Sequence, residues 1–147
     1  MNRGKRALVP LGIAFALAAS PAAAQQMTAT KQTNVRYAMV NMTKFKPGAA
    51  RRANETISKT FMPSAKAAGI PMPSTYHPQT GEWDVIAIFP MADGISELEY
   101  SMTPSDAKWL AAMSKSLGGQ DKAMALIDEY NGLIETNDRM LVHEHTD

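Results

Sequence analysis

GEWDVIAIFP, residues 81–90, carries the clearest strand pattern around which the fold can be predicted. It is rich in β-branched and aromatic residues, which makes it the better strand former of a hairpin predicted around a turn at residues 78–81. Side chains alternate between the two faces of a strand. One face here carries Asp84, Ile86 and Ile88, and the other carries Trp83, Val85, Ala87 and Phe89. Both faces are largely apolar, which predicts a strand that is covered on both sides.

The segments around this strand show the periodicities of further strands and helices. NVRYAMVNMTKF, residues 34–45, is predicted to be a strand that KPG ends. Residues 49–68 repeat apolar positions at spacings of three or four, which predicts an amphipathic helix ending at Gly69, with a kink or break at Pro63. Residues 92–134 are expected to form several helices, one of them capped at Thr103, and RMLVHEH, residues 139–145, the last strand.

This order of elements predicts an α+β, ferredoxin-like fold. Its pattern is β-α-β-β-α-β, with an antiparallel four-stranded sheet, helices on one face and an enlarged second helical segment. The other face of the sheet would then be bare, and an apolar face of this kind normally marks an interface. We expect a homodimer through that face, and the interface residues would be Tyr37, Met39, Val85, Phe89 and Leu141, with Trp83 also on the bare face.

The N-terminal residues have the three regions of a signal peptide. Basic residues come first, ALVPLGIAFALAA follows, and Ala22 to Ala24 match a cleavage site, so residues 1–24 are predicted to be removed. Residues 25–33 are polar and predicted to be a flexible leader, and residues 34–147 the folded domain. The protein is therefore expected to be exported, either to the periplasm or out of the cell, with no stable membrane anchor after cleavage.

Composition excludes several classes of function. Three of the 15 basic residues lie in the signal segment, which leaves 12 Lys and Arg against 14 Asp and Glu, so charge gives no case for nucleic-acid binding. The chain has no cysteine, hence no disulfide, thiolate ligand or cysteine nucleophile. No Gly-x-Ser-x-Gly, glycine-rich phosphate loop or His-Glu-x-x-His motif occurs either.

Asn41 is unusual because a carboxamide in mid-strand, beside Tyr37 and Met39, is costly unless it is hydrogen-bonded. Two explanations stay open. Asn41 could orient a substrate carbonyl or an oxygen-derived anion in a pocket, or it could bond to a neighbouring helix or loop.

His143 and His145 lie two apart in the last predicted strand and would share one of its faces. Two imidazoles supply only half of a tetrahedral shell, and His77 is the sole remaining histidine, so no metal site is predicted. The alternatives are a polar strand end and a pocket role for His143. Of the 11 methionines, Met39, Met42, Met113 and Met124 fall on apolar stripes, where a thioether fills core gaps, so copper coordination is not expected.

The chain resembles the dimeric α/β-barrel superfamily, which includes antibiotic-biosynthesis-type and haem-degrading monooxygenases. The resemblance covers about residues 34–145 and rests on VRYAMVNMTKFKPG, AARRANETISKTFMPSAKAAG, GEWDVIAIFPM and RMLVHEH. It implies two sheets packed face to face, with a pocket between sheet and helices in each protomer. The haem-degrading branch uses a first-strand asparagine, which Asn41 matches, but no helix here carries its tryptophan and histidine together.

Three hypotheses of function follow. The first is an exported dimer that binds a small apolar or aromatic molecule, without a cofactor, in a pocket lined by Tyr37, Asn41, Trp83 and His143. The second is a cofactor-free monooxygenase or isomerase, in which Asn41 polarises the substrate and a histidine is the general base. The third is a structural or assembly protein without a ligand.

Overall fold

The computed structural model of the protein describes residues 28–146. The predicted signal peptide and residues 25–27 of the predicted leader lie outside the described residues. Residues 28–33 have no regular secondary structure, and the described residues from Gln32 onward group into one compact unit.

The elements alternate between strands and helices along the chain. The strands are β1 (Val35–Phe45), β2 (Ser74–Tyr76), β3 (Val85–Pro90) and β4 (Ile134–His145). The helical elements are α1 (Ala50–Thr56), the π-helical turn η1 (Ile57–Phe61), α2 (Met62–Ala68), the 3-10 helix η2 (Gly94–Glu99), α3 (Pro104–Leu117) and α4 (Gln120–Gly132). All strand pairs are antiparallel, in the order β2-β3-β1-β4. This α+β arrangement fits a ferredoxin-like fold, as the sequence predicted.

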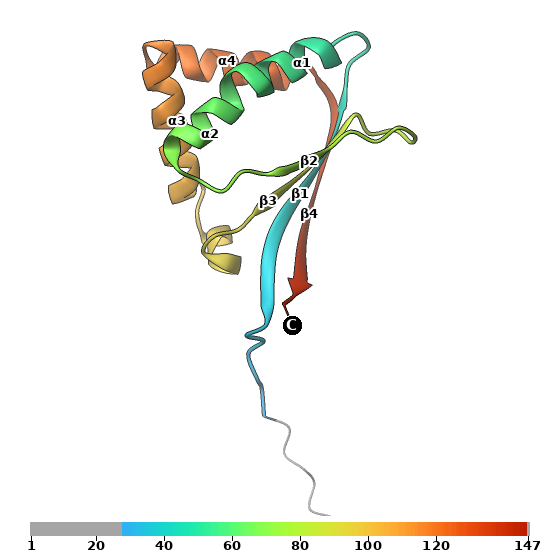
Figure 1. The fold of residues 1–147 in the computed structure, drawn as a ribbon, viewed down its shortest axis with the longest axis vertical. Helices are drawn as coiled ribbons and strands as arrows, with labels where there is room; N and C mark the ends of the chain where they lie inside the picture. The colour runs from blue at the N-terminus through green and yellow to red at the C-terminus, as the bar shows by residue number, and fades with distance from the viewer. Residues whose placement is uncertain (1–27, 147) are drawn as a thin grey trace, which may run out of the picture. The chain divides into compact units, whose positions relative to one another are not determined.

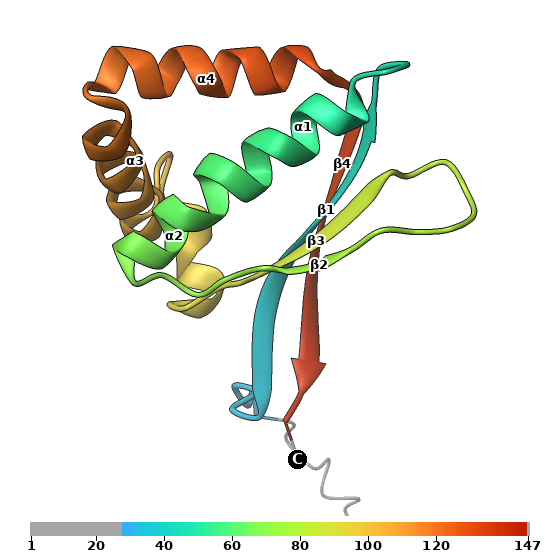
Figure 2. The same cartoon turned by 45° about the horizontal axis from the view of Figure 1, so that its top comes forward.

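The helices lie on one side of the sheet (Figures 1 and 2). The core sits between the two layers, where Phe45 of β1 and Val85 of β3 pack against Ala53 of α1. Each of these three residues is at most 5% exposed. Tyr130 of α4 and Ile134 of β4 pack against the same cluster.

The predicted helix of residues 49–68 forms without breaking, although Pro63 lies inside it. Proline has no N–H, so the α-helical hydrogen bond to the carbonyl of Lys59 is lost. The turn just before it widens into η1, in which the backbone N–H of Met62 donates to the carbonyl of Ile57, five residues earlier. The predicted kink is thus realised as a π-helical turn, and the helix ends at Gly69 with φ 64°.

The cap of α3 is formed as its sequence predicted. The Thr103 hydroxyl accepts from the backbone N–H of Asp106 at 3.0 Å, and the Asp106 carboxylate accepts from the backbone N–H of Thr103 at 3.2 Å. This capping box satisfies two groups that would otherwise lack partners at the helix start.

Two strands differ from their predicted ranges. β3 begins at Val85, because Asp84 turns its carboxylate to the end of β1 and accepts from the N–H of Phe45 at 2.7 Å. Trp83 therefore precedes the strand and shares no strand face with Val85. β4 begins at Ile134 instead of Arg139, because its polar first half pairs with β1 all the way to Phe45.

The predicted bare face of the sheet is the wrong one. Val85 is buried against α1. Phe89 lies on the same face of β3, and Met39 and Leu141 share that face because Met39 is the cross-strand partner of both Phe89 and Leu141. Tyr37 is on that face too, near η2. The helices cover this face because it carries Phe45 and Val85, which Ala53 is small enough to approach closely. The face without helices, called the open face below, carries Ala38, Val40, Met42, Tyr76, Ile86, Ile88, Met140 and Val142.

Candidate functional site

Two hollows of similar size occur in the described part of the chain. The first, called the surface groove, has a volume of about 650 Å³ and lies between α1, η1 and the β2 region. The second has a volume of about 610 Å³ and lies between the helices and the covered face of the sheet. It is called the helix–sheet cavity below. Since volume does not separate them, their linings decide which is the better candidate.

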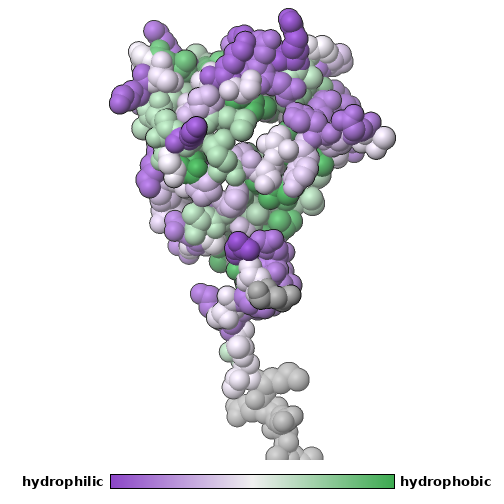
Figure 3. All heavy atoms as spheres, in the orientation of Figure 1, coloured by the Kyte–Doolittle hydropathy of each residue, from purple (hydrophilic) through white to green (hydrophobic). Residues whose placement is uncertain are grey.

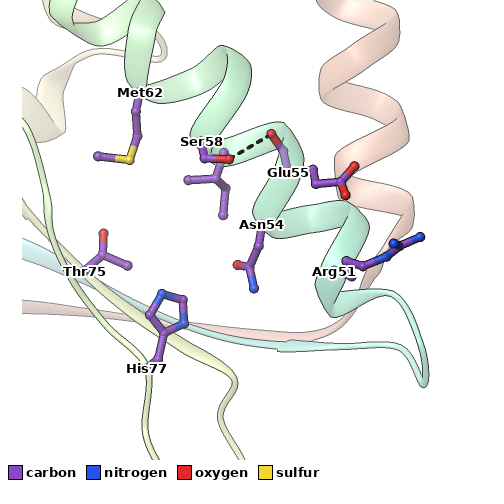
Figure 4. Close-up of a pocket in the computed structure, with 8 residues that line it drawn as sticks. Arg51, Asn54, Glu55, Ser58, Met62, Thr75 and His77 are labelled. Carbon is purple, nitrogen blue, oxygen red and sulfur yellow. Dashed lines mark hydrogen bonds between the residues drawn. The ribbon is translucent and has the colours of Figure 1, made fainter.

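The surface groove is lined mainly by exposed polar side chains. Figure 4 shows Asn54 of α1 pointing toward the imidazole of His77, with Met62 and Thr75 at the other end of the groove. Arg51 points away from these side chains (Figure 4). The hydroxyl of Ser58 is turned back onto the carbonyl of Glu55 at 3.3 Å. Asn54 and His77 are thus the polar pair that this groove brings together, and the other charged or hydroxyl groups named here are turned away or already bonded.

The helix–sheet cavity has an aromatic wall. The ring of Phe61, at the end of η1, meets the rings of Trp109 and Tyr130 edge to face, with centroids 5.2 and 5.0 Å away. All three residues line the cavity. Trp109 is held in place because its indole N–H donates to the carbonyl of Phe61 at 3.1 Å. An apolar and aromatic wall of this kind suits a small apolar molecule.

Asn41 supplies the polar group that this wall lacks. It lines the cavity from β1, and its Oδ1 is buried and accepts no hydrogen bond from the described residues. A buried acceptor without a donor costs about 1–3 kcal/mol, so such atoms need an explanation. Of the two explanations for Asn41 left open by the sequence, a hydrogen bond from a neighbouring helix or loop to this oxygen does not occur among the described residues.

Thr43 and Tyr130 are two further polar residues of the cavity. Thr43 donates to the side-chain oxygen of Asn137 at 3.2 Å, and both residues line the cavity. Burial raises the pKa of Tyr130 above the usual range of tyrosine, so its phenol keeps its proton at neutral pH.

Of the four expected pocket residues, Asn41 alone lines the cavity. Trp83 lies in the loop before β3, and His143 is near the far end of β4, where its ring centroid is 5.9 Å from that of Tyr37. His143 and His145 do share a strand face, with centroids 5.2 Å apart. Within residues 28–146 no group of three or more His, Asp and Glu side chains is placed to hold a metal ion.

Some of the lining residues that were not predicted had partial signals in the sequence. Phe61 and Tyr130 fall on the apolar stripes of their helices. Arg139 also lines the cavity, and it shares the face of Asn41 because the two lie opposite each other in the β1–β4 pairing. That register is set by the folded sheet, so the sequence could not reveal it.

The fold and the cavity define an α+β protein of ferredoxin-like fold with a hollow between its sheet and its helices. Several solved structures resemble it, among them two NIPSNAP family proteins from Agrobacterium tumefaciens. The first is 12% identical, covers 73% of this chain and 90% of its own, and has a TM-score of 0.51. The second, of unknown function, is 11% identical, covers 78% of this chain and 93% of its own, and has a TM-score of 0.53.

At this identity the likeness shows a shared fold and nothing about activity. No protein-family model matches the chain, and no curated protein does. The expected ferredoxin-like α/β fold is thus supported, and the narrower resemblance to antibiotic-biosynthesis-type monooxygenases stays a prediction. Among residues 28–146, no helix has the length and apolar character needed to cross a membrane.

Proposed function

We propose that the protein binds a small, mainly apolar or aromatic molecule in the helix–sheet cavity. The observation that carries this proposal is the buried Oδ1 of Asn41, which has no donor among the described residues and belongs to a residue that lines the same cavity as the aromatic side chains. A ligand that donates a hydrogen bond to this oxygen would remove the free-energy penalty of leaving it unpaired. The aromatic wall would bury the apolar part of the same ligand.

The proposed alternative of a cofactor-free monooxygenase or isomerase has less support. It needs a general base, and no histidine lines the cavity in the described part of the chain. Two carboxylates line it, but both accept hydrogen bonds within their own segments: Glu97 from the N–H of Asp93 at 3.0 Å, and Asp106 in the capping box of α3. Binding therefore fits this lining better than proton abstraction does.

A neutral fluorescent probe tests the proposal. N-phenyl-1-naphthylamine should bind saturably to the protein purified from cells expressing the full chain. Ala87 lines the cavity from β3, so Ala87→Phe should fill it and weaken binding about tenfold or more. Ala125→Phe, at an exposed position of α4, is the matched control and should bind like the unmodified protein. Equal binding by a folded Ala87→Phe variant would contradict the proposal.

We further propose that two copies pack through their open faces, as in a dimeric α/β barrel. Three neighbouring strands contribute apolar side chains to this face, among them Val40 and its two cross-strand neighbours Ile88 and Met140. Tyr76 and Met140 remain 57% and 46% exposed there, which favours a partner surface. The dimer would leave each helix–sheet cavity on the other side of its own sheet.

We also propose that the protein is exported and cleaved after Ala24. The support is the order of basic, apolar and small residues in the first 24 positions. N-terminal sequencing of the protein from the producing cell should start at Gln25. A soluble form that retains Met1 or Asn2 would contradict export.

A further inference from the structure

Arg139 is the only Lys, Arg or His side chain among the described residues that line the helix–sheet cavity. It lies on β4 directly opposite Asn41 of β1. Arg139 is an exposed residue, and within residues 28–146 its guanidinium takes part in no ion pair and no side-chain hydrogen bond. The cavity therefore holds a cationic group that is available to a ligand.

The two carboxylates of the cavity do not neutralise this cation. Glu97 belongs to η2 and Asp106 to α3, and neither approaches Arg139 within 4.0 Å. Each carboxylate instead accepts a backbone hydrogen bond of its own segment. The sheet side of the cavity thus presents a positive charge and a buried acceptor next to each other.

The guanidinium of Arg139 and the Oδ1 of Asn41 bind different chemical groups. A guanidinium binds a carboxylate with two parallel hydrogen bonds. The Oδ1 of Asn41 accepts and cannot bond to a carboxylate oxygen, so it needs an O–H or N–H. Residues directly opposite in an antiparallel pair have Cβ atoms about 4.5–5.5 Å apart, so one small ligand can reach both.

We propose that the ligand of the cavity is an aromatic or otherwise apolar acid that also carries a hydrogen-bond donor. Its carboxylate binds Arg139, its O–H or N–H donates to Asn41, and its apolar body packs against Phe61, Trp109 and Tyr130. This inference rests on the proposed function and narrows it to one chemical class.

Four probes that share an indole ring separate the contributions. Indole-3-acetic acid has both the carboxylate and the ring N–H, and its N1-methyl derivative lacks the N–H donor. Indole-3-acetamide has no negative charge, and tryptamine carries a positive charge in place of the negative one. Titration calorimetry on the protein purified from cells expressing the full chain should give indole-3-acetic acid the lowest Kd. The other three should bind about tenfold more weakly, and the acid should lose affinity as salt is raised.

Two substitutions assign the effect to residues. Arg139→Met should raise the Kd of indole-3-acetic acid about tenfold and leave that of the amide unchanged. Arg36→Met is the matched control, because Arg36 is paired with Glu144 at 3.2 Å and does not line the cavity, so the acid should bind it normally. Asn41→Leu should remove the preference for the N–H over the N-methyl probe. Circular dichroism and the unfolding midpoint check that each variant is folded.

The results that overturn this inference are distinct from failure of the proposed function. Equal affinity for the acid and the amide, or tighter binding of tryptamine, would show that Arg139 does not select an anion. If none of the four probes binds while N-phenyl-1-naphthylamine still binds in a way that Ala87→Phe prevents, the acid class is wrong and the apolar cavity stands. If that neutral probe fails as well, both proposals fall.

Discussion

The indole N–H of Trp109 donates a 3.1 Å hydrogen bond to the carbonyl oxygen of Phe61, and the two rings meet edge to face. This pair joins α3 to the end of the π-helical turn η1 and forms part of the cavity wall. The contact lies two residues before Pro63, where the helix has lost an α-helical hydrogen bond, so we expect it to help hold Phe61 in place.

Trp109→Phe should therefore destabilise the fold by about 1–3 kcal/mol, since it removes the donor to a part-buried carbonyl. Chemical denaturation measures the free energy of unfolding. Trp83→Phe is the control, because no side-chain hydrogen bond of Trp83 occurs in the described residues, and it should cost less. A Trp109→Phe variant as stable as the unmodified protein would show that the bond contributes nothing.

Asn41→Leu should leave the free energy of unfolding unchanged or raise it by about 1 kcal/mol, because it removes a buried acceptor that has no partner in the described residues. At the same time it should weaken ligand binding. Gain of stability with loss of binding is the signature of a residue kept for function. Strong destabilisation instead would indicate that Asn41 has a structural partner.

Substitutions on the two sheet faces should separate folding from assembly. Ile88→Lys, on the open face, should give a folded monomer in light scattering at micromolar concentration, because an unpaired charge in an interface costs several kcal/mol. Ala125→Lys on α4 is the control and should stay dimeric. A monomeric unmodified protein would refute the dimer.

Val85→Lys should act differently from Ile88→Lys. Val85 is only 5% exposed and packs in the core, so its replacement should unfold the protein at any concentration instead of dissociating it. A folded, monomeric Val85→Lys variant in circular dichroism and light scattering would contradict the assignment of the faces.

Tyr130 should make stability fall at alkaline pH. Its pKa is raised by burial, so the folded chain binds the phenolic proton more tightly than the unfolded chain does. Stability is therefore lost from about pH 10, where unfolded tyrosine ionises, up to the higher pKa of the folded state. Unfolding midpoints between pH 8 and 11 should fall less steeply for Tyr130→Phe than for the unmodified protein.

His143→Ala and His145→Ala should leave ligand binding unchanged, because neither residue lines the helix–sheet cavity. They should also leave zinc and copper uptake unchanged, since two imidazoles do not complete a tetrahedral shell. Titration calorimetry measures both. Stoichiometric metal binding with submicromolar affinity that either substitution abolishes would replace this interpretation with a metal site.

Local sequence determined which segments become strands and helices. Alternation in GEWDVIAIFP specified a strand, Thr103 and Asp106 specified a helix start, and Gly69 ended a helix because glycine adopts positive φ without strain. These outcomes depend on interactions within a few residues, so they can be recognised without the rest of the fold. Mid-strand Asn41 could be singled out for the same reason.

Packing between distant segments set which face of the sheet the helices cover and which residues lie beside Asn41 there. Both faces of β3 are apolar, so its alternation did not distinguish the core side from the open side. The core side is the face that carries Phe45 and Val85, because these two residues pack closely against Ala53 of α1. Arg139 joined Asn41 because β4 pairs with β1 in one particular register, which depends on contacts between residues almost 100 positions apart.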